Sequence, residues 1–191
     1  MLPTVLVLAS GRGERFLASG GSTHKLRALL AGKPVLAHVL DAVRASGLPW
    51  HLEDAGHPGM GDSIAAAVRA TLDANGWLIL PGDLPLIQGA TLGMLAGKLA
   101  GARAGSLAGV AQSYDVVVPV CNGQRAHPVG FSAACRDSLL NLKGNQGAAS
   151  VISAYQAIEI VVNDMGTVTD IDTVQDLQRA QTLIDARQPL I

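Results

Sequence analysis

The feature that most restricts the fold is a continuous apolar run near the start of the chain, Thr4–Ala9. The run shows no alternation of apolar and polar side chains, and it is bounded by Pro3 on one side and by Ser10-Gly11 on the other. A short Val- and Leu-rich run of this kind is typical of a strand that is covered on both faces, as in parallel sheets. The chain is therefore predicted to open with a central strand of an α/β domain.

The rest of the chain alternates between short apolar runs and segments whose apolar residues recur with helical periodicity. The predicted strands are Thr4–Ala9, Pro49–Glu53, Trp77–Leu80, Val116–Val120 and Ala157–Val162, and the predicted helices are Pro34–Ala45, Ser63–Ala74, Thr91–Leu99 and Thr173–Arg187. Strands that alternate with helices predict a mostly parallel sheet with right-handed crossovers. We expect surface loops at Asp54–Gly61, which is rich in glycine, and around residues 100–106, which are mostly Ala and Gly.

Length and composition exclude several classes of protein. The 191 residues predict one domain, 1–191, and an apolar fraction of 49% excludes a disordered chain. A formal net charge of −1 leaves no basic face for nucleic acid, and no eighteen consecutive apolar residues are available to span a membrane. The first residues show no signal peptide, and Cys121 and Cys135 have no partner motif. We therefore expect a cytoplasmic protein with two inert thiols.

In parallel α/β sheets, ligands bind beyond the carboxyl ends of the strands, so the polar segment after the first strand is a candidate phosphate site. Gly11 and Gly13 allow a close approach of the backbone to a ligand, and Arg12, Arg15 and Lys25 add positive charge nearby. The segment matches neither the GxGxxG pattern nor the Lys-Ser/Thr end of a P-loop. A mobile surface turn with solvated arginines is therefore an equal alternative.

Two sets of carboxylates are candidate metal ligands. Asp83 follows the third predicted strand between two prolines, and Asp170 and Asp172 flank Ile171 just before the last predicted helix. Mg²⁺ typically takes one or two carboxylates together with phosphate oxygens. Capping of a following helix is the alternative for each of these aspartates.

Two further segments could contact a substrate. His127 is fixed by the following Pro128, so its ring either faces a ligand or is simply exposed. Gly59–Ser63 precedes a helix and could bind an anion at the helix N-terminus, although Asp62 or Ser63 could equally be a helix cap. Taken together, a Gly-rich cationic loop and an isolated aspartate at a strand end suit a nucleoside triphosphate with Mg²⁺.

These motifs resemble those of the MobA-like nucleotidyltransferases, in sequence order and over nearly the whole chain. The segments that carry the resemblance are Leu8–Phe16, Lys25 with Gly32–Leu36, Gly59–Ile64, Pro81–Leu86, Ala126–Val129 and Asp170–Thr173. Three of these segments resemble most closely the molybdenum cofactor cytidylyltransferase branch: Gly59–Ile64, Ala126–Val129 and Asp170–Thr173. The resemblance implies a Rossmann-like three-layer fold with a mixed, mostly parallel sheet. That sheet would be shortened at one edge, because Gly47–Gly61 is too short for the family's strand-helix-strand.

The resemblance also implies a function and a set of roles. The chain would transfer a nucleotidyl group from an NTP, first of all CTP, to a molybdopterin-type phosphate, with Mg²⁺ as cofactor and pyrophosphate as the leaving group. The product would pass to a molybdoenzyme. By motif position, the catalytic residues would be Lys25, Asp83 and Arg15, the nucleotide would be lined by Ala9, Ser10, Gly11, Gly13, Ser63 and Gly82, the metal would be held by Asp83 and Asp172, and His127 would face the acceptor.

Two alternatives remain at this point. The first is nucleotidyl transfer with another nucleotide, such as GTP, or to another acceptor, such as a sugar phosphate. The second is a non-catalytic carrier of the molybdenum cofactor, which would have no need for two metal-binding aspartates. The chain also departs from the family at Asn145, where an aspartate is common.

Overall fold

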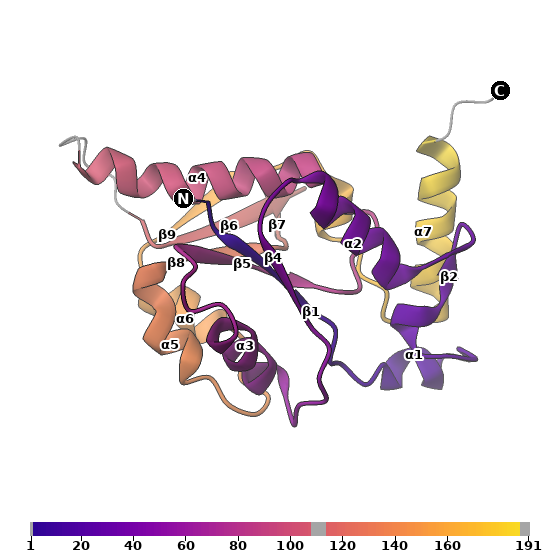
Figure 1. Ribbon diagram of the computed structural model, residues 1–191. Coiled ribbons are helices and arrows are strands. Elements are labelled where there is room, and N and C mark those ends of the chain that lie inside the picture. Colours follow the sequence, from indigo (N-terminus) through magenta and orange to yellow (C-terminus); the bar gives the residue numbers. More distant parts are fainter. Residues whose placement is uncertain (1, 108–113, 188–191) are drawn as a thin grey trace.

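A central sheet lies between two layers of helices (Figure 1). The structure is a computed structural model that describes residues 2–107 and 114–187. Its strands are β1 (Thr4–Leu8), β2 (Leu29–Leu30), β3 (Lys33–Pro34), β4 (Trp50–Glu53), β5 (Gly76–Pro81), β6 (Val116–Cys121), β7 (Gln124–Arg125), β8 (Val129–Ser132) and β9 (Ala157–Val161). Its helices are α1 (Glu14–Ala18), α2 (Val35–Ala45), α3 (Met60–Arg69), α4 (Gly89–Leu107), α5 (Arg136–Leu140), α6 (Ala149–Ala154) and α7 (Val174–Arg187), with short 3₁₀ turns η1 (Lys25–Arg27), η2 (Ala133–Cys135) and η3 (Met165–Thr167).

The main sheet is mixed and mostly parallel, as predicted. Its order is β4-β1-β5-β8-β6-β7, and β9 pairs with β6 on the other side of that strand. The pairs β1–β4, β1–β5 and β6–β9 are parallel, whereas β8 runs antiparallel between β5 and β6. Within the described residues the sheet ends at β4, so it is short on that side, as the length of the 47–61 segment predicts.

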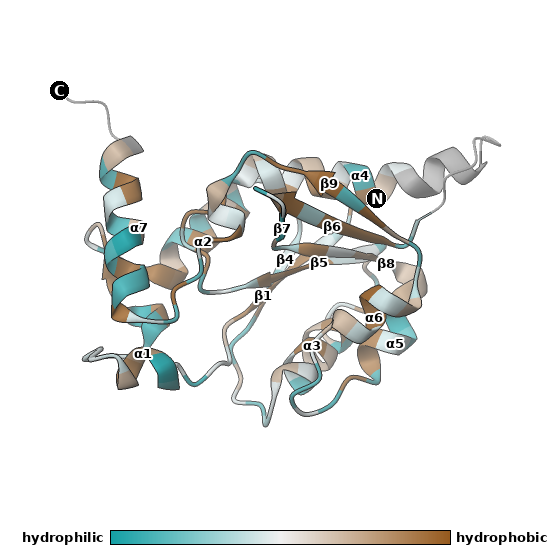
Figure 2. Ribbon diagram, turned by 180° about the vertical axis from the view of Figure 1, so that it is seen from behind, coloured by the Kyte–Doolittle hydropathy of each residue, from teal (hydrophilic) through white to brown (hydrophobic). Residues whose placement is uncertain are grey.

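Alternate residues of each central strand enter two separate cores. Val5 and Val7 pack with α2 and α4 on one face, and Leu6 packs with α3 and α5 on the other. All three are fully buried. Figure 2 shows β6 mostly in brown, the colour of hydrophobic residues. Burial on both faces explains why the first apolar run has no polar alternation.

A third, smaller core lies beside the sheet and joins the two ends of the chain. Phe16 of α1 and Leu26 of η1 pack there against Ile171 and against Ala180 of α7. In Figure 1, α1 and α7 stand next to each other at one side of the sheet. This unit positions residues from the first and last parts of the sequence next to one another.

Two predicted helices have different bounds in the structure. α3 begins at Met60 rather than Ser63 and ends at Arg69 rather than Ala74. The early start follows from the backbone contact of Gly61, whose N–H donates to Gly144 O at 2.8 Å, and the early end from a turn at Thr71, whose hydroxyl accepts a hydrogen bond from the Trp77 indole. α4 continues to Leu107, so the loop expected around residues 100–106 was wrong. The alanines of this stretch have high helix propensity and favour continuation.

Some elements had no signal in the sequence. β8 is short and contains Gly130, and it lies in the middle of the sheet only because β5 and β6 pair with it on both sides. Within the described residues, no helix is both long enough and apolar enough to cross a membrane.

Candidate active site

The carboxyl ends of three parallel strands meet at one edge of the sheet. Leu8 of β1 pairs with Glu53 of β4 and with Pro81 of β5, so the loops that follow these strands start side by side. Antiparallel β8 begins at the same edge, which brings the preceding His127 to the same place. The loops enclose an open cleft of about 840 Å³.

Most of the predicted site residues line this cleft. Those that do are Ser10, Gly11, Gly13, Arg15, Lys25, Ser63, Gly82, Asp83, His127 and Asp172. Ala9 does not: its N–H donates to Glu53 O at 2.8 Å, and its side chain packs against the cluster of Phe16 and Leu26. Ala9 therefore supports the Gly-rich loop through these contacts and does not itself line the cleft.

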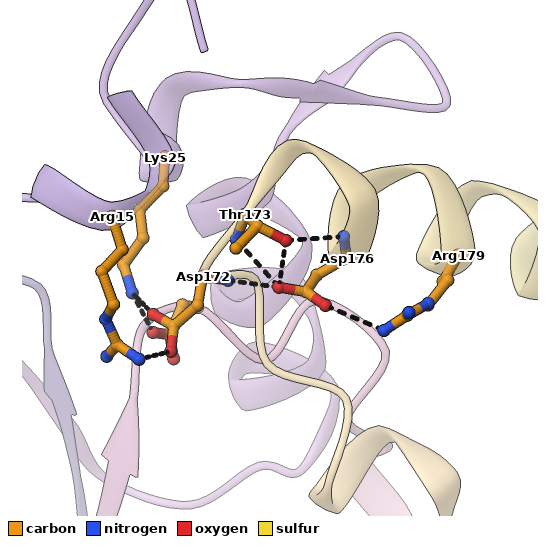
Figure 3. Close-up of polar contacts among 7 residues, drawn as sticks. Arg15, Lys25, Asp172, Thr173, Asp176 and Arg179 are labelled. Atoms are coloured by element: carbon orange, nitrogen blue, oxygen red, sulfur yellow. Dashed lines mark hydrogen bonds and ion pairs between the residues drawn. The ribbon is translucent and has the colours of Figure 1, made fainter. Parts of the chain in front are cut away.

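The centre of the cleft is a compact cluster of four charged side chains. The Lys25 ammonium donates to Asp83 Oδ2 at 2.6 Å and to Asp172 Oδ1 at 2.7 Å. Arg15 approaches the other oxygen of Asp172 at 2.7 Å, so Arg15 and Lys25 converge on one carboxylate (Figure 3). Burial alone would lower the pKa of Lys25, but the charge of Asp83 and the hydrogen bonds to both aspartates raise it above its ordinary value. Lys25 is therefore a permanent cation near neutral pH.

The backbone fixes the two aspartates against each other. The N–H of Gly82 donates to Leu8 O at 2.8 Å, and a Cβ on Gly82 would lie 3.0 Å from that oxygen, so glycine permits the close approach. The carbonyl of Asp83 accepts the N–H of Ile171 at 2.9 Å, which ties the end of β5 to the segment before α7. Asp172 follows directly and lies beside Asp83 for this reason.

Other side chains than Asp172 cap α7, and the metal role of Asp172 stays a prediction. The first turn of α7 is capped by Thr173 and Asp176: Asp176 Oδ2 accepts the N–H of Thr173 at 2.8 Å, and the Thr173 hydroxyl accepts the N–H of Asp176. The carboxylate of Asp172 is thereby left for Lys25 and Arg15 (Figure 3). Asp170 also lines the cleft, and burial, with the charges of Asp83 and Asp172, raises its pKa.

The aspartates fit a divalent cation. Asp83 Oδ1 is buried and has no hydrogen-bond partner among the described residues, so one carboxylate oxygen is available at the centre of the cleft. The described part of the chain has no group of three His, Cys, Asp or Glu residues arranged to hold a metal by itself. Mg²⁺ commonly takes only one or two carboxylates and completes its shell with phosphate oxygens and water. Asp83 and Asp172 match that pattern.

The Gly-rich loop is held in place by His24, which the sequence did not single out. His24 Nε2 lies 2.7 Å from Gly11 O, and a Cβ on Gly13 would lie 3.2 Å from the His24 ring. Gly13 has a φ of 67°, a left-handed conformation that favours glycine, and it is the N-cap of α1. On the other side of the loop, Ser10 Oγ contacts Ser63 Oγ of α3 at 2.7 Å. The loop therefore has anchors on both sides.

His127 lines the cleft and is exposed there, and its position toward the acceptor stays a prediction. Its N–H donates to Thr167 O at 3.0 Å, which connects the segment before β8 to η3. Desolvation by the surrounding cleft lowers the pKa of His127, although the charges of Asp83 and Asp170 act in the opposite direction. The ring is consequently neutral near pH 7 and offers one donor and one acceptor nitrogen.

Sequence reasoning missed a second polar pair at the cleft, Glu53 and His57. His57 lines the cleft and its Nε2 lies 3.0 Å from Oε1 of the buried Glu53. Burial alone would raise the pKa of Glu53, but the hydrogen bonds from His57 and from the Ala55 N–H hold it below its ordinary value. The available signal was a carboxylate at the end of a strand with a histidine four residues later.

The depressed pKa of Glu53 predicts a pH dependence of stability. Ionised Glu53 stabilises the fold above the ordinary pKa of 4.5, and this contribution is lost as the pH falls through the lower folded value. We expect Glu53→Gln to lower the free energy of unfolding by about 2 kcal/mol at pH 7 and to flatten the loss of stability below pH 4.5. Urea unfolding between pH 7 and 3.5 measures both. The exposed Glu159, changed to Gln, is the control; equal slopes in wild type and Glu53→Gln would contradict the expectation.

The two cysteines lie away from this chemistry. Cys121 and Cys135 are free and buried. Burial raises the pKa of the Cys135 thiol to about 12, so this group stays protonated and unreactive, as expected from the sequence.

Comparisons with known proteins identify the family. A family model described as the MobA-like NTP transferase domain matches residues 40–158, more than half of the chain. The bifunctional protein GlmU of Azoarcus sp. (strain BH72) is 31% identical over 157 residues, which cover 70% of this chain and 31% of GlmU. The chain spans less than a third of the length of the curated relatives it matches.

Solved structures show the same fold at low sequence identity. A nucleotidyl transferase from Methanothermobacter thermautotroptrophicus superposes with a TM-score of 0.75 at 18% identity, covering 98% of this chain and 99% of that one. The molybdopterin-guanine dinucleotide biosynthesis protein A from Archaeoglobus fulgidus gives a TM-score of 0.64 at 18% identity, covering 96% of this chain and 99% of that one. From the match of the family model to more than half of its residues, the chain belongs to the family of the MobA-like NTP transferase domain.

Proposed function

We propose that the chain transfers a nucleotidyl group, CMP in the first place, from an NTP to a molybdopterin-type phosphate acceptor and releases pyrophosphate. The observation that carries this proposal is the bridge of Lys25 between Asp83 and Asp172 beside the Gly-rich loop. Such a cluster combines a fixed cation with two carboxylates at the carboxyl edge of a parallel sheet, where nucleotides bind in α/β folds.

The cations of this cluster serve the leaving group. Lys25 is held by two carboxylates and cannot swing away, so it stabilises negative charge that develops on the departing pyrophosphate. Arg15 has 78% of its side chain exposed and, within residues 2–107 and 114–187, pairs only with Asp172, so it can turn toward the phosphates when they arrive. The backbone of Gly11 and Gly13 approaches the same phosphates without side-chain interference.

The carboxylates serve a divalent cation, and Mg²⁺ is the one we propose. Asp83, with its unpartnered Oδ1, and Asp172 would hold it. When bound, the ion supplies positive charge that neutralises the phosphate oxygens and orients them. The presence of two aspartates that could bind a metal favours a metal-dependent transferase over a carrier, because a carrier performs no phosphate chemistry.

The acceptor would lie against His127. Its neutral ring can donate a hydrogen bond to an acceptor phosphate or pterin without adding charge. The choice of CTP and of a molybdopterin-type acceptor is supported by the segments at Gly59–Ile64, Ala126–Val129 and Asp170–Thr173. The likeness in fold to a protein named for molybdopterin-guanine dinucleotide biosynthesis supports the acceptor further. A molybdoenzyme would then receive the product.

Pyrophosphate release tests the proposal. We expect release with CTP, Mg²⁺ and molybdopterin, and slower or no release with GTP, ATP or UTP. Omission of molybdopterin separates transfer from hydrolysis. Release only with a sugar 1-phosphate would identify the acceptor as a sugar phosphate, and binding of molybdopterin without any release would identify a carrier.

The roles of the carboxylates near α7 predict different effects of magnesium. Asp172→Ala is expected to raise the Mg²⁺ concentration for half-maximal activity by about 10- to 100-fold and to lower the maximal rate. Thr173→Ala removes the cap of α7, so we expect a loss of about 1 kcal/mol in stability with an unchanged magnesium dependence. Asp170→Ala should change the magnesium dependence less than Asp172→Ala.

Magnesium titrations of activity, run beside thermal melting curves, check these expectations. If Asp172→Ala lowers only the melting temperature, Asp172 holds the fold together and Asp83 alone is left for the metal.

A further inference from the structure

The cluster of ion-paired charges lies on one side of the cleft, its charged side. Lys25, Asp83 and Asp172 form the charged side, next to α1 and α7. On the other side, at the start of α3, the cleft is lined by Ser63 and by Asn145 of the loop between α5 and α6. In Figure 1, α3 and this loop lie together below the sheet, away from α1 and α7.

The loop that carries Asn145 is fixed to the first turn of α3. Gly144 makes two backbone hydrogen bonds there: its carbonyl accepts the N–H of Gly61 at 2.8 Å, and its N–H donates to Asp62 Oδ2 at 2.9 Å. A Cβ on Gly59 would lie 2.2 Å from the carbonyl group of Gly144. The two backbones are therefore in direct contact, and Asp62 is the side chain that joins them.

Asn145 is the residue that this contact presents to the cleft. It follows Gly144 directly, is exposed, and lines the cleft. Among the described residues its side-chain amide has no hydrogen-bond partner. Ser63, which follows Asp62, contacts Ser10 of the Gly-rich loop, so the same turn of α3 connects the Gly-rich loop with the loop of Asn145.

We propose that Asp62 is a positioning residue that holds Asn145 against the uncharged nucleoside part of the bound nucleotide. The proposal rests on the proposed function, because it requires a nucleotide in the cleft. A neutral amide offers both a donor and an acceptor, which suit ribose hydroxyls and the edge of a base. The phosphates are attracted instead to Lys25 and Arg15 on the charged side.

Binding of two probes separates this role from a general loss of structure. Calorimetry would use the NTP that wild type binds most tightly among CTP, GTP, UTP and ATP, and inorganic tripolyphosphate, each with Mg²⁺. Asp62→Ala and Asn145→Ala are each expected to weaken NTP binding about fivefold, the effect of one lost hydrogen bond. Tripolyphosphate, which has no nucleoside, should bind within about twofold of wild type.

Three further variants complete the test. The double variant should bind the NTP no more weakly than Asn145→Ala, because both changes remove the same contact. Asp62→Asn keeps an oxygen that can accept the N–H of Gly144 and should restore most of the affinity. Asp73→Ala changes an exposed aspartate outside the cleft and should have no effect.

The outcomes distinguish the two proposals. Failure of wild type to bind any of these probes would overturn the proposed function and this inference with it. If wild type binds normally, three results would overturn this inference and leave the proposed function standing. The first is that Asn145→Ala binds the NTP as tightly as wild type does. The others are that the two single effects multiply in the double variant, or that the variants lose as much affinity for tripolyphosphate as for the NTP. Asn145 is exposed, and its side chain makes no hydrogen bond to another described residue. We therefore expect Asn145→Ala to fold, so the test does not depend on Asp62→Ala.

Discussion

Asp83→Asn is expected to abolish pyrophosphate release. Asparagine keeps the shape of the side chain but removes the charge that would hold a divalent cation beside the leaving group. The loss of stability should stay within about 2 kcal/mol, since Lys25 keeps Asp172 as a partner and the Asp83 carbonyl still accepts the Ile171 N–H. Only 16% of the Asp83 side chain is exposed, so this limit is wider than for a solvent-facing residue.

Asp54→Asn is a matched control for this prediction. Asp54 follows β4 directly and Asp83 follows β5 after Gly82, but Asp54 is exposed and does not line the cleft. Steady-state pyrophosphate release and a urea titration should be measured for both variants. More than a tenth of wild-type activity in Asp83→Asn would remove Asp83 from the catalytic roles proposed for it.

Lys25→Ala is expected to have the second largest effect. The loss of one preorganised cation typically reduces the rate about 100- to 1,000-fold. The variant also leaves Asp83 and Asp172 side by side without their shared partner, so their repulsion lowers stability. A divalent cation can replace the missing charge between the two carboxylates. The melting temperature of Lys25→Ala should therefore rise more steeply with Mg²⁺ than that of wild type.

Lys33→Ala provides the comparison. Lys33 pairs with Asp41 on the surface, and both side chains are nearly half exposed, so solvent screens the pair and it contributes little to stability. We expect wild-type rates and a wild-type magnesium response from this variant. Equal rate losses in the two variants, or melting curves of Lys25→Ala that ignore Mg²⁺, would show that Lys25 does not lie between the carboxylates in solution.

The spacing of apolar residues predicted the helices and strands whose formation depends on residues close in the sequence. Apolar runs and helical periodicity predicted β1, β5, β6, α2 and α7 to within a few residues. This works because the spacing of apolar side chains along an element reflects which of its faces are buried. β8 could not be found this way. Its four residues become a central strand only through pairing with β5 and β6, which are distant in the sequence.

The site shows the same division. The position of Asp83 after a strand and of Lys25 after the Gly-rich loop suggested that both face the cleft, and the structure brings them to 2.6 Å. The sequence held no sign that one lysine bridges two aspartates, since Lys25 and Asp172 are separated by 147 positions. The anchors at His24 and Asp62 were equally hidden, because each contacts backbone atoms of a distant loop rather than a partner side chain.

The third core, which joins α1, η1 and α7 beside the sheet, has a consequence for the energetics of the site. Its buried residues differ from those of the two cores that hold the sheet together, although Leu36 of α2 packs against both it and one of those cores. We expect it to open at a lower free-energy cost than the sheet. Opening would carry Lys25 and Asp172 away from Asp83, which stays at the end of β5. A nucleotide that binds all three groups would add its binding free energy to the cost of this opening. The bound ligand would then stabilise the contact of α1 and α7 with the sheet. Product release and local unfolding of α7 would be thermodynamically coupled, so that each would favour the other.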